Sequence, residues 1–447
     1  MADFWCEQAW VDGRLRTRVR VSTGADGMIS AVAADVDHRG TDIVLRGIVF
    51  GGFANVHSHA FHRALRGRTH ADSQHGGSFW TWRSAMYAVA ASLTPDTYFE
   101  LARAAYAEMV LAGICAVGEF HYLHHDQHGR CYADPNAMSG ALRAAAAEAG
   151  IRLTLLDTCY LHGGLTADGY VPLTAAQRRF GDGSADAWRE RHALLQGDAD
   201  TVIGAAIHSN RAVSPDEIPA VVAGAGDGPL HVHLSEQPAE NDASLASHGR
   251  SPTEVLRDGG ALGPQTTAVH ATHLTATDVA LLGGGGVCLC PTTERDLSDG
   301  IGPGRALADA GASLSVGSDS HAIVDLLEEV RAVETHERLA SQVRGHFRPA
   351  EQVDILTRQG YAALGRPGGG ALRVGSTADL VAVRTDSVRT TGAAPEQLIM
   401  VATAADVTDV VVGGVHQVRG GEHRLGSVSD LLRRSLGRVW ADTEEKI

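Results

Sequence analysis

The chain has 447 residues, 44% of them hydrophobic, and a formal net charge of −15 at pH 7. An acidic chain repels phosphate backbones, which excludes nucleic acid as a partner, and no apolar run is long enough to span a bilayer. The N-terminus lacks a basic region before an apolar core, and the six cysteines follow no paired spacing. We therefore expect a cytoplasmic protein with reduced thiols and no membrane partner.

Both ends of the chain predict short strands separated by glycine-containing turns. These segments are 5–11, 15–21, 29–36, 379–383 and 409–412. We expect residues 1–48 and 370–447 to form one small β-sandwich domain built from both termini, followed by a C-terminal tail.

Between these ends, apolar strands alternate with helices. The eight predicted strands are 48–57, 114–121, 151–160, 202–209, 230–234, 267–273, 286–291 and 312–319. The clearest helical segments between and after them are 98–111, 136–149 and 326–341. Strands that are buried on both faces are continuous apolar runs, and most of these are. The alternation predicts an α/β fold, a (β/α)8 TIM-type barrel over residues 49–369.

Polar residues gather where four of these strands end. They are His57 and His59 on the first, His231, His233 and Glu236 on the fifth, His270 and His273 on the sixth, and Asp319 and His321 on the eighth. The i, i+2 spacing of His57 and His59 directs both side chains to one face of a strand. In a (β/α)8 barrel the C-terminal strand ends share one rim, where catalytic residues lie. Because a packed core has no use for imidazoles and carboxylates there, their conjunction predicts a metal site.

These motifs resemble the amidohydrolase superfamily over nearly the whole chain. The resemblance rests on the His-x-His pair, residues 233–236 (HLSE), His270 and the Ser318-Asp319 pair. It implies that members with one metal ion hold it through positions matching His57, His59, His233 and Asp319. The only lysine is Lys446, so no lysine in the body of the chain can bridge two metals. We expect one ion per chain, zinc by ligand type, with iron or manganese as alternatives.

The same residue types suit hydrolysis of a C–N bond at an sp2 carbon. Zinc lowers the pKa of a bound water to about 7, which makes hydroxide available at neutral pH. Asp319 can take the proton of the water, and Glu236 can relay a proton to a leaving nitrogen. His270 can donate to the developing tetrahedral centre. Glu236, His270 and Asp319 are therefore the expected catalytic residues.

Four longer motifs resemble the formimino-L-glutamate deiminase family of histidine degradation. They are residues 55–65 (NVHSHAFHRAL), 79–83 (FWTWR), 118–125 (GEFHYLHH) and 207–213 (IHSNRAV). Members of that family convert N-formimino-L-glutamate and water to N-formyl-L-glutamate and ammonia. Carboxylates favour arginine forks. Arg211 lies just past the fourth strand and Arg83 lies in the long loop after the first, so both are expected at the rim.

The resemblance implies that Arg83, Tyr122, His208 and Arg211 bind the small-molecule substrate. Position 62 departs from the family pattern. The family usually has a glutamine there that is thought to contact the substrate, whereas this chain has His62, which is shorter and can carry a charge. We include His62 in the expected substrate site. The resemblance also implies a homodimer.

Two other functions remain open at this point. Another deaminase of the superfamily would act on a purine, pterin or aminotriazine ring through aromatic stacking. That function would be favoured if Arg83 and Arg211 pointed away from the metal. A catalytically silent scaffold is the second alternative, but such a protein is expected to lack a ligand or the acid, and this chain keeps them all.

Overall fold

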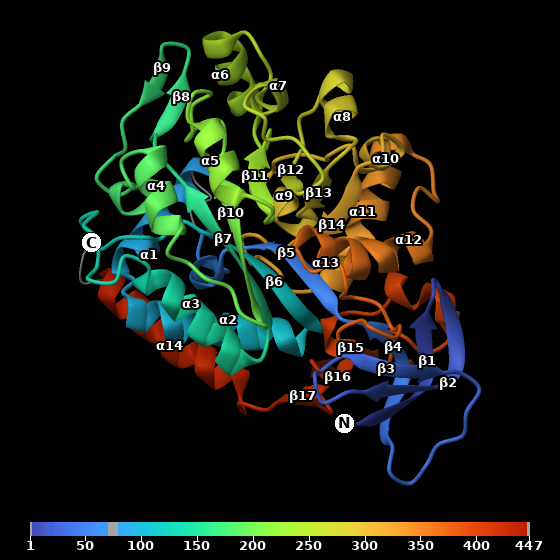
Figure 1. Cartoon of the computed structure of the whole chain (residues 1–447). Helices are drawn as coiled ribbons and strands as arrows, with labels where there is room; N and C mark the ends of the chain where they lie inside the picture. Colours follow the sequence, from blue (N-terminus) through green and yellow to red (C-terminus); the bar gives the residue numbers. More distant parts are fainter. Residues whose placement is uncertain (1, 70–78, 445–447) are drawn as a thin grey trace.

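The computed structural model describes residues 2–69 and 79–444 (Figure 1). Its central element is a nearly closed barrel of eight parallel strands, with neighbours in chain order. The strands are β5 (Phe53–Ser58), β6 (Ile114–His121), β7 (Arg152–Cys159), β10 (Thr201–Ile207), β11 (Leu230–Leu234), β12 (Thr266–His270), β13 (Gly286–Leu289) and β14 (Ser313–Val316). An isolated parallel bridge between Ser58 and Asp319 joins the first strand to the chain after the last. The (β/α)8 TIM-type barrel predicted from the sequence is confirmed.

Side-chain contacts complete the closure at the catalytic rim. Nδ2 of Asn55 donates to Oγ of Ser318 at 2.8 Å, and the backbone N of Ser318 donates to Oδ1 of Asn55 at 2.9 Å. Gly317 allows this close approach, since a Cβ atom there would lie only 2.8 Å from the Cβ of His57. The closure therefore brings His57 and Asp319, from opposite ends of the barrel sequence, to the same place.

Helices surround the barrel. They are α1 (Phe79–Ser92), α2 (Pro95–Leu111), α3 (Ala137–Ala149), α4 (Ala185–His192), α5 (Ile218–Ala225), α6 (Pro238–His248), α7 (Pro252–Asp258), α8 (Ala276–Leu282), α9 (Pro291–Leu297), α10 (Gly304–Asp309), α11 (Leu326–Ser341), α12 (Pro349–Asp354) and α13 (Gly360–Ala363). Local signals explain several starts. Thr94 caps α2 by accepting from the backbone N of Thr97, and Ser251 caps α7 through Glu254 in the same way.

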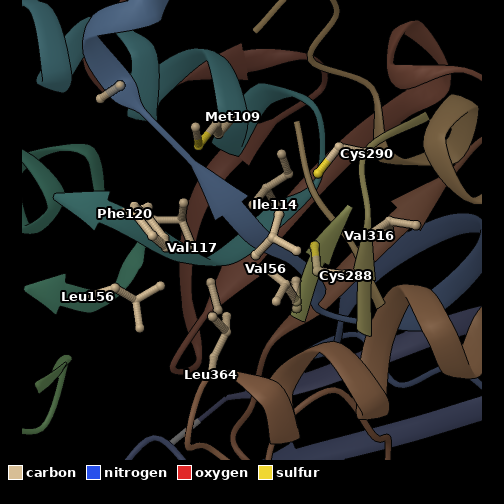
Figure 2. Close-up of a cluster of buried hydrophobic side chains, with 14 of the residues drawn as sticks. Val56, Met109, Ile114, Val117, Phe120, Leu156, Cys288, Cys290, Val316 and Leu364 are labelled. Atoms are coloured by element: carbon tan, nitrogen blue, oxygen red, sulfur yellow. The ribbon is translucent and has the colours of Figure 1, made fainter. Parts of the chain in front are cut away.

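The barrel interior is packed with apolar side chains. Figure 2 shows part of a buried hydrophobic cluster, to which Val56 of β5, Val117 of β6, Leu156 of β7 and Cys288 of β13 contribute. All four are fully buried. Below the C-terminal rim the barrel strands are thus largely apolar, with a few buried polar side chains such as Thr154 and His231, which contact the carbonyls of Leu364 and Ala363.

A second, mixed sheet lies beside the barrel and is built from both termini, as expected. Its order is β18 (Glu422–His423), β17 (Val415–Arg419), β16 (Val407–Val412), β15 (Leu380–Val383), β4 (Ile43–Gly51), β1 (Asp3–Val11), β2 (Arg14–Thr23) and β3 (Ile29–Ala33). Buried residues from both ends of the chain, including Phe4, Leu45, Leu380 and Val411, form its own hydrophobic cluster. A separate two-stranded hairpin, β8 (Gly164–Thr166) and β9 (Gly169–Val171), stands above the barrel rim.

One expectation about element boundaries was wrong. The strand expected over 48–57 is divided: residues up to Gly51 continue β4 of the terminal sheet, and the barrel strand begins at Phe53. After the last strand of the terminal sheet comes a long helix, α14 (Val428–Glu444). α14 packs against α2 of the barrel (Figure 1), where Trp440 Nε1 donates to the Ala64 carbonyl at 3.1 Å. Within the described ranges, no helix is both long and apolar enough to cross a membrane.

Candidate active site

The four expected metal ligands converge at the centre of the rim. His57 lies in β5, His59 just beyond it, His233 in β11 and Asp319 after β14. The backbone stays extended through His59 (φ −125°, ψ 96°), so both imidazoles keep the same direction. Oδ1 of Asp319 lies 3.4 Å from Nε2 of His57 and 3.4 Å from Nε2 of His59. Nε2 of His233 lies 3.1 Å from Nε2 of His57.

These spacings fit the ligands of one ion. Atoms bound at about 2.0–2.1 Å to a tetrahedral ion lie roughly 3.3–3.4 Å from one another. Nδ1 of His59 lies 2.9 Å from the Phe120 carbonyl oxygen, and Nδ1 of His233 lies 2.8 Å from that of His208. A carbonyl can only accept, so each Nδ1 carries the proton and each Nε2 directs a lone pair to the centre.

Burial sets the protonation states of this cluster. Burial lowers the pKa of His59 to about 3 and also lowers the pKa values of His57 and His233, so all three imidazoles are neutral at pH 7. Burial alone would raise the pKa of Asp319, but the hydrogen bond from His57 and the neighbouring histidines hold it well below its usual range. Neutral imidazoles beside a carboxylate are the form that binds a divalent ion, so the donor set fits a metal.

Glu236 and His270 stand next to this cluster. Nε2 of His270 lies 3.7 Å from Oε1 of Glu236 and 3.8 Å from Oδ2 of Asp319, and its Nδ1 lies 3.6 Å from Oε1 of Glu294. Burial lowers the pKa of His270, but Glu236 and the other two carboxylates outweigh burial and raise it well above the usual value. His270 is therefore protonated and can donate. Glu294, in the first turn of α9, was not predicted, and its place one turn past a strand end is the signal that points to it.

The backbone at the rim is strained at several non-glycine residues. Those with positive φ after the strand ends are Ser235, His270, Ala271, Asp319 and His321. Residues in this region cost of order 1 kcal/mol or more each and persist where the surrounding structure requires them. Three strand ends therefore turn sharply, which directs their polar side chains toward the centre.

One cavity of about 280 Å³ joins the ligand cluster to the expected substrate site. All five expected substrate residues line it: His62, Arg83, Tyr122, His208 and Arg211. Aromatic residues form much of the remaining wall: Trp82, Tyr87, Tyr160 and Phe180. The cavity is thus apolar on its sides and charged at specific points, as small-molecule sites are.

Two of these residues differ from expectation in detail. Arg83 lies on helix α1, not in a loop, and its Nε donates to Oη of Tyr87, one turn further along, at 2.6 Å. His62 lies in a short 3-10 turn, with Nε2 3.1 Å from Oη of Tyr122. Burial lowers the pKa of His62 well below its usual value, so this side chain is neutral rather than charged.

Arg211 contacts two carboxylates. Its Nη2 lies 3.4 Å from Oε2 of Glu236, and its Nε lies 3.5 Å from Oε2 of Glu240. Burial lowers the pKa of Arg211, but Glu240 and Glu236 raise it, and the net shift is upward. Glu240 was not predicted from the sequence. Its position in the first turn of α6, four residues after Glu236, is the signal that could have identified it.

Comparisons with known proteins show which family the chain resembles. The family model described as "Amidohydrolase family" matches residues 48–416. The chain is 36% identical over 440 residues to the formimidoylglutamate deiminase of Pseudomonas aeruginosa, covering 95% of this chain and 96% of that protein. It is 29% identical over 389 residues to the 8-oxoguanine deaminase of the same organism, covering 84% and 83%. The crystal structure of an amidohydrolase from Brucella melitensis superimposes with a TM-score of 0.90 at 32% identity, covering 98% of this chain and 100% of that one. The match of the family model to more than half of the chain shows that the protein belongs to the amidohydrolase family.

Proposed function

We propose that the protein hydrolyses N-formimino-L-glutamate to N-formyl-L-glutamate and ammonia. The observation that carries the proposal is the pair Arg83 and Arg211, which line the same cavity as the expected ligand cluster. A linear amidine with two carboxylates needs two cationic contacts and a hydrolytic centre within reach of both. The similarity to the Pseudomonas aeruginosa formimidoylglutamate deiminase over nearly the whole of both chains supports the same substrate.

The reaction adds water to the formimino carbon, breaks one C–N bond and releases the nitrogen as ammonia. A divalent ion held by His57, His59, His233 and Asp319 would lower the pKa of a water molecule beside this carbon. Asp319 accepts the proton of the attacking water. Its Oδ2 suits this role because Oδ1 faces His57 and His59, whereas Oδ2 faces His270.

Glu236 and His270 move the remaining protons. The protonated His270 donates to the substrate group on which negative charge develops. Glu236 has one oxygen toward His270 and the other toward Arg211, which places its carboxyl between the hydrolytic centre and the substrate arm. It relays a proton to the departing nitrogen, which leaves as ammonia.

The two arginines hold the carboxylates of the substrate. Nε and Nη2 of Arg211 face Glu240 and Glu236, and Nη1 donates no hydrogen bond to residues 2–69 or 79–444. That edge is available to a substrate carboxylate, so Arg211 offers one charge-assisted contact rather than a fork. Arg83 and Tyr87 provide the second contact from α1, and Tyr122 and His208 add donors near the formimino group.

A ring deaminase is the second candidate, because Trp82, Tyr87, Tyr160 and Phe180 offer aromatic walls that can stack on a base. The similarity to a protein named 8-oxoguanine deaminase supports it less strongly, at lower identity and coverage. Two arginines in the cavity favour a ligand with carboxylates over a neutral ring, since guanidinium groups form charge-assisted contacts with carboxylates. The intact catalytic set gives no support to a silent scaffold.

The proposal extends to the metal, the pathway, the cellular location, the oligomeric state and the domain bounds. Zinc is favoured by three imidazoles and one carboxylate, and iron and manganese are the alternatives. A place in histidine degradation follows from the proposed substrate. A cytoplasmic location agrees with six free cysteines, five of them buried. The homodimer rests on family resemblance, and analytical ultracentrifugation tests it. We also propose residues 49–369 as the hydrolase domain, flanked by 1–48 and 370–447.

Ammonia release from a substrate panel, combined with elemental analysis of the same preparation, tests the function. The panel contains the formimino derivatives of L-glutamate, L-aspartate and glycine, together with guanine and cytosine. We expect turnover of formimino-L-glutamate above all others, with one metal ion per chain. Turnover of a base without turnover of any formimino acid would replace this proposal with the ring-deaminase function.

A further inference from the structure

Glu240 is a buried acid that the mechanism above does not use. It lies in the first turn of α6, its side chain is 0% exposed, and it lines the active-site cavity. Neither of its carboxyl oxygens makes a hydrogen bond of good geometry within the described residues, although the backbone N–H groups of Ser235 and Glu236 face the carboxyl and lower its pKa. Its one close charged neighbour there is Arg211, at 3.5 Å. An acid in this position is costly unless the arginine offsets its desolvation.

The charges of Glu240 and Arg211 depend on each other. Burial raises the pKa of Glu240, and Arg211 is the main group that opposes this rise. In turn, Glu240 is the main group that raises the pKa of Arg211 against burial. The net shift of the Glu240 pKa is upward, so Arg211 offsets the effect of burial on this carboxyl only in part, and the charge states of the two groups are coupled.

The arginine of this pair also contacts the proposed proton shuttle. The distances from Arg211 to Glu240 and to Glu236 are nearly equal, 3.5 and 3.4 Å, and both exceed the 2.7–2.9 Å typical of a tight charge-assisted pair. Arg211 is therefore shared between two acids and bound tightly by neither. If one acid lost its charge, the arginine would close onto the other.

From this geometry we propose that Glu240 is a positioning residue that keeps Arg211 from closing onto Glu236. The proposal deepens the proposed function and rests on it. By holding Nε of Arg211, Glu240 leaves the Glu236 carboxyl free to move a proton and leaves the Nη1 edge free for a substrate carboxylate. Without the charge of Glu240, Arg211 and Glu236 would form a tight pair, and both tasks would suffer.

Glu240→Gln is the direct variant, because it keeps the shape and removes the charge. We expect kcat for formimino-L-glutamate to fall about tenfold and KM to rise a few-fold. Asp242→Asn is the matched control: it removes an acid from the same helix, but from an exposed position that does not line the cavity. The control should leave both constants unchanged. Unchanged kcat and KM in Glu240→Gln would overturn the proposal.

A double-mutant cycle with Arg211→Met separates positioning from a general structural role. If Glu240 acts through Arg211, then Glu240→Gln should change kcat and KM less than about twofold in the Arg211→Met background. An equal loss in both backgrounds would show that Glu240 acts by another route and would overturn the proposal.

Thermal unfolding of the same variants gives a readout that needs no substrate. Arg211→Met leaves Glu240 buried and unpaired, so its Tm should fall, and adding Glu240→Gln should recover at least half of that loss. A double variant no more stable than Arg211→Met would mean that the pair does not exist. If the double variant recovers the lost Tm but the wild type releases no ammonia from formimino-L-glutamate, the Arg211–Glu240 pair is confirmed and the proposed function is wrong.

Discussion

Replacing Arg211 with methionine tests the carboxylate contact on which the substrate assignment depends. The change keeps most of the apolar stem and removes the cation. Because Nε and Nη2 face Glu240 and Glu236, one edge remains for the substrate, and one charge-assisted hydrogen bond is lost. Such a bond contributes about 1.5–3 kcal/mol. At about 1.4 kcal/mol for each factor of ten, kcat/KM for formimino-L-glutamate should fall roughly 10- to 150-fold.

The assay is steady-state ammonia release, normalised to bound metal, for wild type and variant. In the wild type we expect formimino-L-glutamate to exceed formimino-L-aspartate, and formimino-glycine to be poorest. A shorter chain cannot reach both Arg83 and Arg211 while its formimino carbon stays at the ligand cluster. Arg295→Met is the control. Arg295 is exposed on α9, so this substitution should leave kcat/KM unchanged. If the wild type handled formimino-glycine as well as formimino-L-glutamate, the two-arginine model would be wrong.

His57→Ala or Asp319→Ala should abolish bound metal or turnover while circular dichroism shows a folded barrel, and two metal ions per wild-type chain would contradict the single site. Glu236→Gln should retain metal by elemental analysis yet lose about 10²–10⁴-fold in kcat, so near-normal turnover would show that Glu236 is not the proton shuttle. Arg191→Met should lower the free energy of unfolding in urea by about 3–5 kcal/mol, because it removes the guanidinium paired with the buried Asp157 and leaves His192 as the nearest partner of that carboxylate, and an unshifted midpoint would refute this. Burial raises the pKa of Asp157, but Arg191 and His192 bring it below the unfolded value. Its contribution to stability is therefore full above about pH 4, is lost as the pH falls further, and should be missing from the acid denaturation curve of Arg191→Met.

Much of the candidate site could be predicted because the spacing of residues along a strand decides which side chains share a face. Residues two apart on a strand share a face, so His57 and His59 must point the same way wherever that strand lies. Eight apolar runs separated by helices leave few architectures open, and in the barrel all carboxyl strand ends share one rim. Local spacing and fold class together therefore predict that the ligand residues lie close together.

The assignment of strands to sheets depended on partners far along the chain. Residues 48–50 and 53–56 form one apolar stretch, yet β4 pairs with β15, more than 300 residues later, and β5 pairs with β6. No local pattern can distinguish these two environments, because both demand buried apolar side chains. The same limit applies to α14, whose apolar face indicates burial but not that α2 would cover it.

By itself the sequence determined the barrel, the terminal sheet and the residue types of the hydrolytic centre, because each follows from periodicity and spacing within short segments. Only the tertiary structure decided how charges are shared at that centre. The sequence predicted Arg211 at the rim, but its contacts with both Glu236 and Glu240 exist only because folding brings the first turn of α6 beside Arg211. Ion pairs form between side chains that folding brings within a few ångströms, and their strength depends on burial as much as on residue type.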